Sequence, residues 1–275
     1  GIGLRCRGTA LPTPRQPAAT PFMTQVSTSD DDALVVDGVT KMFHQLTAVD
    51  GVSFRLSRGE ILGLIGPNGS GKSTLINMMS GVLQPTYGHI VASGTAISRL
   101  APHAVARAGI ARTFQGVRLF GDLSVLENVM VAAMSVGVRR RAARQRAEEL
   151  LAYFGLSAWI GSAANSLPYG HERIVEVARA LAMNPKFLLL DEPAAGLDEN
   201  ESEALLQQLL ELPRQRNLGL LIVDHDMALI MRLCERIHVL NYGQSIADGK
   251  PDEIRRDPAV LEAYLGRGGE EAVYA

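Results

Sequence analysis

The segment from Gly66 to Thr74 combines glycines, a lysine and hydroxyl side chains at spacings that suit phosphate binding. It satisfies the pattern G-x-x-x-x-G-K-[ST], and its residues are, in order, Gly66, Pro67, Asn68, Gly69, Ser70, Gly71, Lys72, Ser73 and Thr74. Glycines let consecutive backbone N–H groups turn inward around phosphate oxygens, and a following helix points its positive end there. Lys72 supplies a mobile cation, and the Ser73 hydroxyl can hold Mg²⁺. The alternative is a chance match in a glycine-rich turn, which the apolar run 61–65 just before the motif disfavours.

A second chemical signal is the acidic pair Asp191 and Glu192, which directly follows the apolar run 187–190. A buried strand that ends in two carboxylates presents them at the carboxyl edge of a parallel sheet, where ligands bind in such folds. Asp191 then suits the coordination shell of Mg²⁺, and Glu192 suits the polarisation of an attacking water. An acidic pair after a strand is by itself usually a solvated turn. Its position downstream of a phosphate-binding loop favours a catalytic role.

The elements that must position these groups follow from the periodicity of apolar residues. Short apolar or β-branched runs predict strands at 34–39 and 49–56, which form an antiparallel part, and a central buried strand at 61–65. A helix is predicted at 73–81, followed by strands at 90–92 and 110–114. From 171 onward the pattern alternates: a helix to 183, a strand at 187–190, a helix at 200–216 and a strand at 218–223. Such alternation predicts a mostly parallel sheet flanked by helices.

Residues 122–155 differ from this pattern, because their apolar residues have helical spacing and no strand is predicted there. Val125, Val129 and Ala132 recur at that spacing, and a second helix with a charged face is predicted at 139–154. The arginines of that helix are interpreted as a solvated face, with contact to lipid headgroups or a membrane protein as the alternative. The sequence therefore predicts an α/β fold with an N-terminal antiparallel β part and a helical subdomain.

Composition and charge narrow the function further. Of the 275 residues, 47% are hydrophobic and 20% are charged, as in an ordinary globular α/β protein, and the net charge of -2 gives no indication of nucleic-acid binding. No apolar run approaches the roughly 20 residues of a membrane-spanning helix. Cys6 and Cys234 lack metal-ligand spacing, which fits a reducing cytoplasm. Residues 1–32 lack apolar periodicity and are expected to be a disordered extension, with Met23 as a candidate natural start.

The phosphate-binding loop, the acidic pair and the segments between them resemble the ATP-binding cassette (ABC) family over about residues 34–265. The resemblance implies that Phe43 stacks on adenine, that Gln115 is the Q-loop ligand of Mg²⁺ and water, and that His225 contacts the γ-phosphate. It also implies that Asp198 lies in the D-loop, which crosses to a partner subunit. The implied cofactors are ATP and Mg²⁺, with Ser73, Gln115 and Asp191 as metal ligands and Glu192, His225, Gln115 and Lys72 as catalytic residues.

The segment Leu167, Pro168, Tyr169, Gly170 and His171 departs from the Leu-Ser-Gly-Gly-Gln signature of that family, which caps the γ-phosphate of the opposite subunit. Pro168 lacks the serine hydroxyl, so one hydrogen bond to phosphate is absent, whereas the Gly170 N–H and the positive end of its helix remain. A proline is well placed at a helix start, because the missing N–H would be unpaired there. The segment is expected to be altered but functional, and a chain that only binds ATP is the alternative.

Four segments resemble the ATPases of branched-chain amino-acid importers in particular, namely 112–120, 167–170, 192–196 and 262–266. The resemblance implies an ATPase core at 33–116 and 167–250, a helical subdomain at 117–166 that docks a permease, and a C-terminal helical tail at 251–275. The implied partners are a second ATP-binding cassette in a homo- or heterodimer, two transmembrane permease subunits and, indirectly, a secreted solute-binding protein. The implied location is peripheral, on the cytoplasmic face of the cell membrane, with no nucleic-acid partner.

Other functions stay open on the sequence alone. A small-molecule kinase with a phosphate-binding loop has no use for the Q-loop, signature and H-loop residues. An ABC protein that acts on ribosomes or DNA generally carries two cassettes or a long coiled-coil insertion, and this sequence has neither. A nucleotide sensor without hydrolysis is favoured only by Pro168 and His171. Among importers, other subunits choose the solute, so amides, urea or another small solute remain alternatives to branched-chain amino acids.

Overall fold

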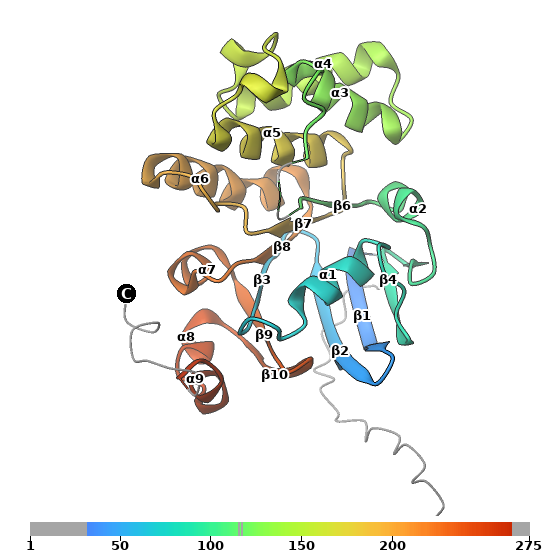
Figure 1. Ribbon diagram of the computed structural model, residues 1–275, viewed down its shortest axis with the longest axis vertical. Helices are drawn as coiled ribbons and strands as arrows, with labels where there is room; N and C mark the ends of the chain where they lie inside the picture. The colour runs from blue at the N-terminus through green and yellow to red at the C-terminus, as the bar shows by residue number, and fades with distance from the viewer. Residues whose placement is uncertain (1–31, 115, 117, 266–275) are drawn as a thin grey trace, which may run out of the picture.

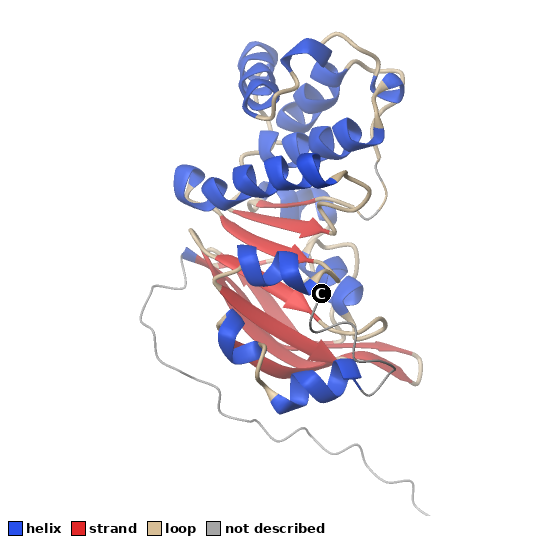
Figure 2. Cartoon of the chain, turned by 90° about the vertical axis from the view of Figure 1, so that its left-hand side faces the viewer, coloured by secondary structure: helices blue, strands red, loops and turns tan. Residues whose placement is uncertain are grey.

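The computed structural model describes residues 32–114, 116 and 118–265. It has a helical part at one end, a six-stranded sheet in the middle, and a four-stranded antiparallel sheet beside it (Figures 1 and 2). The predicted α/β fold with an antiparallel N-terminal part is confirmed. Gln115, the predicted disordered segment up to residue 31 and the last ten residues of the predicted tail, 266–275, lie outside the described residues.

The antiparallel sheet is built from the first two strands and a later hairpin. Strand β1 (Ala33–Phe43) pairs with β2 (Leu46–Ser57) on one side and with β4 (Tyr87–Ala92) on the other, and β5 (Thr95–Ala96) completes the sheet. All three pairings that define the order β2-β1-β4-β5 are antiparallel. β1 and β2 are longer than the predicted runs, because half-buried strand residues at their ends do not stand out from loop residues in hydropathy.

The central sheet has the strand order β10-β9-β3-β8-β7-β6. Strands β9, β3, β8, β7 and β6 run parallel, and β10 adds to β9 in antiparallel fashion at one edge. The strands are β3 (Ile61–Ile65), β6 (Ile110–Arg112), β7 (Phe187–Asp191), β8 (Gly219–Val223), β9 (Arg236–Asn241) and β10 (Gln244–Gly249). The mostly parallel sheet is therefore confirmed, and β9 and β10 are additions to the four strands that the sequence pattern predicted.

Helices cover both faces of this sheet and form the end opposite the antiparallel part (Figure 1). The predicted helices are present with small shifts of their ends, and among the described residues no helix is long and apolar enough to cross a lipid bilayer. They are α1 (Lys72–Met79), α2 (Pro102–Arg107), α3 (Val125–Ser135), α4 (Arg140–Tyr153), α5 (Tyr169–Ala182), α6 (Glu199–Arg216), α7 (Met227–Leu233), α8 (Pro251–Ile254) and α9 (Pro258–Leu265).

Two hydrophobic clusters lie on opposite faces of the central sheet. Side chains alternate between the faces of a strand, so Leu188 and Leu190 of β7 pack in the cluster that includes α3 to α7. Phe187 and Leu189 of the same strand pack in the other cluster, with α1 and the antiparallel sheet. Strand β7 is thus buried on both faces, as a nearly continuous apolar run predicts. This packing fixes the position of Asp191, the last residue of β7, at the carboxyl edge of the sheet.

Leu189→Ala tests the two-sided packing of β7. The side chain is fully buried, so its truncation should lower the free energy of unfolding by about 2–5 kcal/mol. Chemical denaturation monitored by circular dichroism measures the change. Leu46→Ala is the matched control, because Leu46 is 67% exposed and should cost no more than about 0.5 kcal/mol. Equal losses for the two variants would contradict the packing described here.

Candidate active site

The phosphate-binding loop leaves β3 through a turn that only glycine can make. Gly66 has φ +149°, and a Cβ there would overlap the carbonyl oxygen of Leu240 in the neighbouring strand β9. Gly71, at φ +105°, precedes the first residue of α1, and a Cβ there would lie 2.6 Å from the carbonyl oxygen of Ala48 in β2. The loop is therefore held between β9 and β2 with its backbone close to both. This is the arrangement that a backbone cradle for phosphate needs.

Lys72 lies at the start of α1 and turns its ammonium group back over the loop. Its Nζ donates to the carbonyl oxygens of Gly66 (2.5 Å) and Pro67 (3.1 Å). Burial lowers the pKa of Lys72, and the nearby carboxylates of Glu192 and Asp191 oppose that shift. A half-buried ammonium group between these carboxylates and the loop can move to phosphate oxygens without leaving the site.

The hydroxyl-bearing residues of the motif differ in exposure. Ser73 is exposed at the start of α1, and Thr74 is half-buried beside it. The buried Ser70 hydroxyl has no hydrogen-bond partner among the described residues, although the Ser70 backbone accepts a bond from the Gly243 N–H at 2.9 Å. Exposed Asn68 and Gly69 form the tip of the loop. The sequence-predicted loop residues thus present a mixture of backbone and hydroxyl groups.

Asp191 ends β7 in a buried position next to a cation. Its carboxylate lies 3.9 Å from a guanidinium nitrogen of Arg112, and its backbone N–H donates to the Thr113 hydroxyl at 3.2 Å. Burial raises the pKa of Asp191, and the charge of Arg112 opposes the rise. Arg112 also donates to Asn77 of α1 at 2.6 Å and to Ser80, the C-cap of that helix, at 3.0 Å. Sequence reasoning did not single out this link between α1 and the carboxylate, since nothing local to Arg112 indicates which groups distant in the chain it contacts.

Glu192 and His225 are brought together at the carboxyl edge of the sheet. The Glu192 Oε1 lies 3.3 Å from the His225 Nδ1, and the two side chains are 26% and 73% exposed. Glu192 has φ +48°, a left-handed conformation that costs on the order of 1–3 kcal/mol in a residue with a side chain. Its backbone N–H donates to the Val223 carbonyl at 2.7 Å, which holds the strained residue to β8. The pair is thus partly open to solvent, as a group that positions a water must be.

The loop that carries His225 is ordered by its neighbour. The buried Asp224 carboxylate accepts hydrogen bonds from the backbone N–H groups of His225 (2.8 Å) and Asp226 (3.0 Å). Burial raises the pKa of Asp224, and these two hydrogen bonds oppose the rise. Asp226 in turn caps α7 by accepting from the Ala228 and Leu229 N–H groups. The short turn after β8 therefore has little freedom, and it holds the imidazole next to Glu192.

The signature segment begins α5 and packs against the D-loop. Pro168 is the N-cap of α5, which agrees with the predicted helix start. A Cβ on Gly196 would overlap the ring of Tyr169, and a Cβ on Gly170 would lie 2.5 Å from the Glu201 carboxylate. Glu201 belongs to a capping box at the start of α6 with Asp198. The site therefore depends on two glycines that let the signature and the D-loop lie in contact.

The remaining signature residues are partly buried. Leu167 is buried, and the His171 ring lies 5.2 Å from the Trp159 ring, measured between centroids. The His171 Nδ1 is buried without a hydrogen-bond partner among the described residues. His171 thus packs on the helical part of the molecule. Of the predicted signature residues, Tyr169 is thus the one with a large exposed side chain, at 48%.

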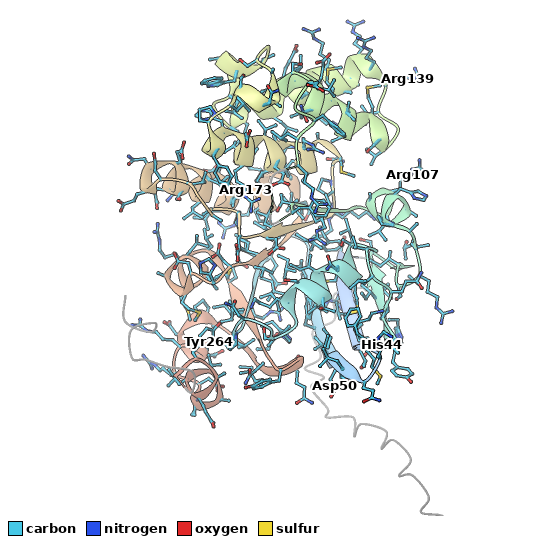
Figure 3. All side chains as sticks on the ribbon, viewed as in Figure 1. His44, Asp50, Arg107, Arg139, Arg173 and Tyr264 are labelled. Carbon is cyan, nitrogen blue, oxygen red and sulfur yellow. The ribbon has the colours of Figure 1, made fainter. Side chains whose placement is uncertain are left out.

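Tyr264 in α9 is a neighbour of the phosphate-binding loop that sequence reasoning missed (Figure 3). Burial raises the pKa of Tyr264 to about 12, and a hydrogen bond with the Gly66 backbone opposes the rise. The C-terminal helix therefore reaches the residue at which β3 turns into the loop. No local pattern could have indicated this contact, because about two hundred residues of chain separate the partners.

Phe43 ends β1 with its ring accessible. The side chain is 40% exposed, and the Lys41 ammonium lies 5.2 Å from the ring centroid. Phe43 pairs with Leu46 across the β1–β2 turn, and Ala48 two residues further along β2 touches the start of the α1 helix. An exposed aromatic ring on a strand that adjoins the loop suits stacking on a nucleobase.

Phe43→Ala should weaken nucleotide binding by about 1–3 kcal/mol, because one stacking surface is removed. Isothermal titration with ATP measures the change, and Phe43→Tyr should bind almost as tightly as the unaltered chain. Tyr87→Ala is a control, since Tyr87 is an exposed aromatic residue on β4 of the same sheet. A lower melting temperature for Phe43→Ala without a selective loss of nucleotide affinity would assign the ring to the core instead.

Comparisons with known proteins agree with this geometry. The ABC transporter family model matches residues 49–195, and a model described as branched-chain amino acid ATP-binding cassette transporter matches residues 244–270. The chain is 38% identical over 248 residues to the high-affinity branched-chain amino acid transport ATP-binding protein BraF of Pseudomonas aeruginosa, covering 85% of this chain and 97% of the relative.

Solved structures give the same result. The ADP conformation of MJ1267, an ATP-binding cassette of an ABC transporter, superposes with a TM-score of 0.77 at 30% identity over 86% of this chain and 99% of that one. MJ0796, a bacterial ABC transporter cassette in a dimeric structure, gives 0.72 at 28% identity over 79% and 98%. Given the loop, the acidic edge and these similarities, the chain belongs to the ABC transporter family and is an ATP-hydrolysing cassette.

Proposed function

We propose that this cassette powers the uptake of branched-chain amino acids. The observation that carries the proposal is the match of residues 244–270 to the model of branched-chain amino-acid cassettes. That segment comprises β10, α8 and α9, and through Tyr264 it touches the phosphate-binding loop. The relative BraF bears the same function in its name. Amides, urea and other small solutes are the alternatives that an assay must separate from leucine, isoleucine and valine.

The proposed assembly follows from how the family works. ABC cassettes function as dimers together with membrane permease subunits. The proposed partners are a second cassette, identical or different, two permease subunits and, indirectly, a secreted solute-binding protein, with no nucleic acid. The cassette would lie peripherally on the cytoplasmic face of the membrane. Residues 117–166, which contain α3 and α4, are the proposed helical subdomain for permease docking, beside a core of 33–116 and 167–250 and a tail of 251–275.

Each site residue has a proposed role in ATP hydrolysis. Phe43 stacks on adenine, and the backbone of the loop 66–74 surrounds the phosphates, with Lys72 neutralising their charge. Glu192 orients or deprotonates the attacking water, and His225, 3.3 Å from it, contacts the γ-phosphate. The segment Leu167 to His171 of the opposite subunit closes over that phosphate, and Asp198 contributes to the same interface.

The donors at the carboxyl edge fit Mg²⁺, which prefers oxygen ligands. The Ser73 hydroxyl is exposed at the start of α1, and the Asp191 carboxylate ends β7, with Gln115 as the third proposed ligand. Burial raises the pKa of Asp191, so a neighbouring cation would favour its ionised form. When bound, Mg²⁺ supplies charge neutralisation to the β- and γ-phosphate oxygens.

Glu192→Gln tests the hydrolytic role and the dimer together. The amide keeps the shape of the side chain but removes the base, so the variant should bind ATP normally, turn over very slowly and accumulate as a closed dimer. Sedimentation with ATP-Mg²⁺, ADP-Mg²⁺ and no nucleotide, with and without a candidate partner cassette, measures this. Glu235→Gln, at an exposed residue before β9, should behave as the unaltered chain does. A Glu192→Gln monomer with undiminished hydrolysis in every mixture would contradict the proposal.

The proposed solute is tested in proteoliposomes that contain the cassettes, the permeases and the binding protein. Leucine, isoleucine or valine should stimulate ATP hydrolysis at least several-fold, whereas urea and short amides should not. Radiolabelled uptake in the same vesicles should follow the same order. Stimulation by urea or an amide with no response to leucine would keep the ATPase assignment and replace the solute.

A further inference from the structure

Among the described residues, Arg173 is the largest fully buried side chain that carries a charge, and it lies one turn into α5, three residues after the predicted signature residue Gly170 (Figure 3). Its side chain is 1% exposed, and its charge is balanced by Glu176 at 2.9 Å on the same helix. Burying a guanidinium group is costly unless its donors find acceptors, and among the described residues the Arg173 Nε has none, so the cost is met by the two terminal nitrogens. The acceptors that Arg173 reaches are therefore informative about why it lies there.

Arg173 bonds three backbone carbonyls that belong to two different functional segments. One terminal nitrogen donates to the Phe114 carbonyl at 2.7 Å, directly before the predicted Q-loop residue. The other donates to the carbonyls of Asp191 and Glu192, each at 2.6 Å. Glu176 binds the same residue, because its carboxylate accepts a hydrogen bond from the Phe114 N–H at 3.3 Å. The Arg173–Glu176 pair thus clamps both backbone groups of Phe114.

The bond to the Glu192 carbonyl acts on a strained residue. Glu192 is in the left-handed region, at φ +48°, and only fixed hydrogen bonds keep a residue with a side chain there. Arg173 holds its carbonyl, and the Val223 carbonyl holds its N–H. The direction of the Glu192 side chain follows from that backbone conformation. A shift of the guanidinium group would therefore turn the carboxylate away from His225.

Arg146 shows by contrast what a purely structural arginine does in this part of the molecule. It lies on α4 and donates to a single carbonyl, that of Ala182 at the far end of α5, at 3.0 Å. It holds α4 to the last turn of α5, and among the described residues it has no hydrogen bond to the acidic edge. Arg173 instead uses the planar fork of its guanidinium group to span three acceptors.

We propose that Arg173 is a positioning residue that links the two ATP sites of the dimer. Arg173 moves with α5, whose first turn contacts the nucleotide of the opposite subunit. It also fixes Glu192, which activates water at the nucleotide of its own subunit. Closure on one nucleotide therefore sets the geometry of the water-activating carboxylate at the other. The inference rests on the proposed roles of Glu192 and the signature segment.

The main test is the double variant Arg173→Met with Glu176→Gln. Removing both charges avoids a lone buried ion, so the protein should keep a melting temperature within a few degrees of the unaltered chain. Misplacement of Glu192 should lower kcat of ATP hydrolysis about 10- to 100-fold, whereas KM for ATP should change less than about threefold, because Arg173 touches no loop that holds the phosphates. Arg146→Met is the matched control and should leave both constants unchanged.

Arg173→Lys is the second variant, since it keeps the charge and the Glu176 pair but cannot span the three carbonyls. It should also lower kcat at least about tenfold at unchanged KM. If the double variant does not fold, Arg173→Lys decides. A folded Arg173 variant with unaltered kcat would overturn the inference, and so would a loss shared equally by Arg146→Met. An unaltered chain without ATPase activity in the assembled transporter would instead contradict the proposed function.

Discussion

Close backbone approach at the end of β3 is the constraint on which the site depends. The chain must leave a strand buried on both faces and turn within van der Waals distance of the Leu240 carbonyl, so Gly66 cannot carry a side chain. The same closeness brings β9 and β2 against the loop and holds its N–H groups in place before any ligand arrives. Preorganised backbone dipoles bind phosphate without a reorganisation cost. The parallel sheet then delivers Asp191 and Glu192 to the same edge, because β7, β8 and β3 are neighbours in register.

Several charged side chains are buried near the carboxyl edge of the central sheet. Side chains of opposite charge lie together at the carboxyl edge, namely those of Lys72, Asp191 and Arg112. The ion pair of Arg173 and Glu176 is buried next to them. Burial raises the pKa of Glu176, and the charge of Arg173 opposes that rise. Such pairs contribute little net stability, since the desolvation of both ions offsets their attraction. Their value lies in geometry: each fixes a backbone segment that carries a functional side chain.

The sequence predicted the parts of the fold in which local pattern and tertiary role agree. The glycine spacing before Lys72 and the apolar run before Asp191 were enough to predict β3, β7 and the loop. Any fold of this kind needs glycines where the backbone turns tightly and apolar side chains where a strand is buried on both faces. Strand β9 was not predicted, since Arg236 and His238 interrupt its apolar pattern. Both side chains contact the Asp248 carboxylate across the β9–β10 hairpin, with a guanidinium nitrogen of Arg236 at 2.8 Å and the His238 Nδ1 at 2.7 Å. A polar strand of this kind is recognisable only when its partners are known.

The contacts of Arg112, Arg173 and Tyr264 could not be predicted for the same reason. Each is an ordinary residue on a helix or strand, and its significance comes from hydrogen-bond partners elsewhere in the chain. By contrast, the sequence singled out Glu192 and His225 one by one, and the structure places the two side chains 3.3 Å apart. Gln115 lies outside the described residues, so its predicted role stays a prediction.

The claim that this cradle drives ATP hydrolysis is tested most directly by the turnover of Lys72→Ala in the assembled transporter. Lys72 is the cation that we propose faces the phosphates, so its removal should lower the rate by orders of magnitude while the protein keeps its fold. Lys186→Ala is the matched control, because Lys186 is exposed and precedes β7 at the opposite edge of the sheet. It should hydrolyse ATP at the unaltered rate. Equal turnover of Lys72→Ala and the unaltered chain would contradict the account.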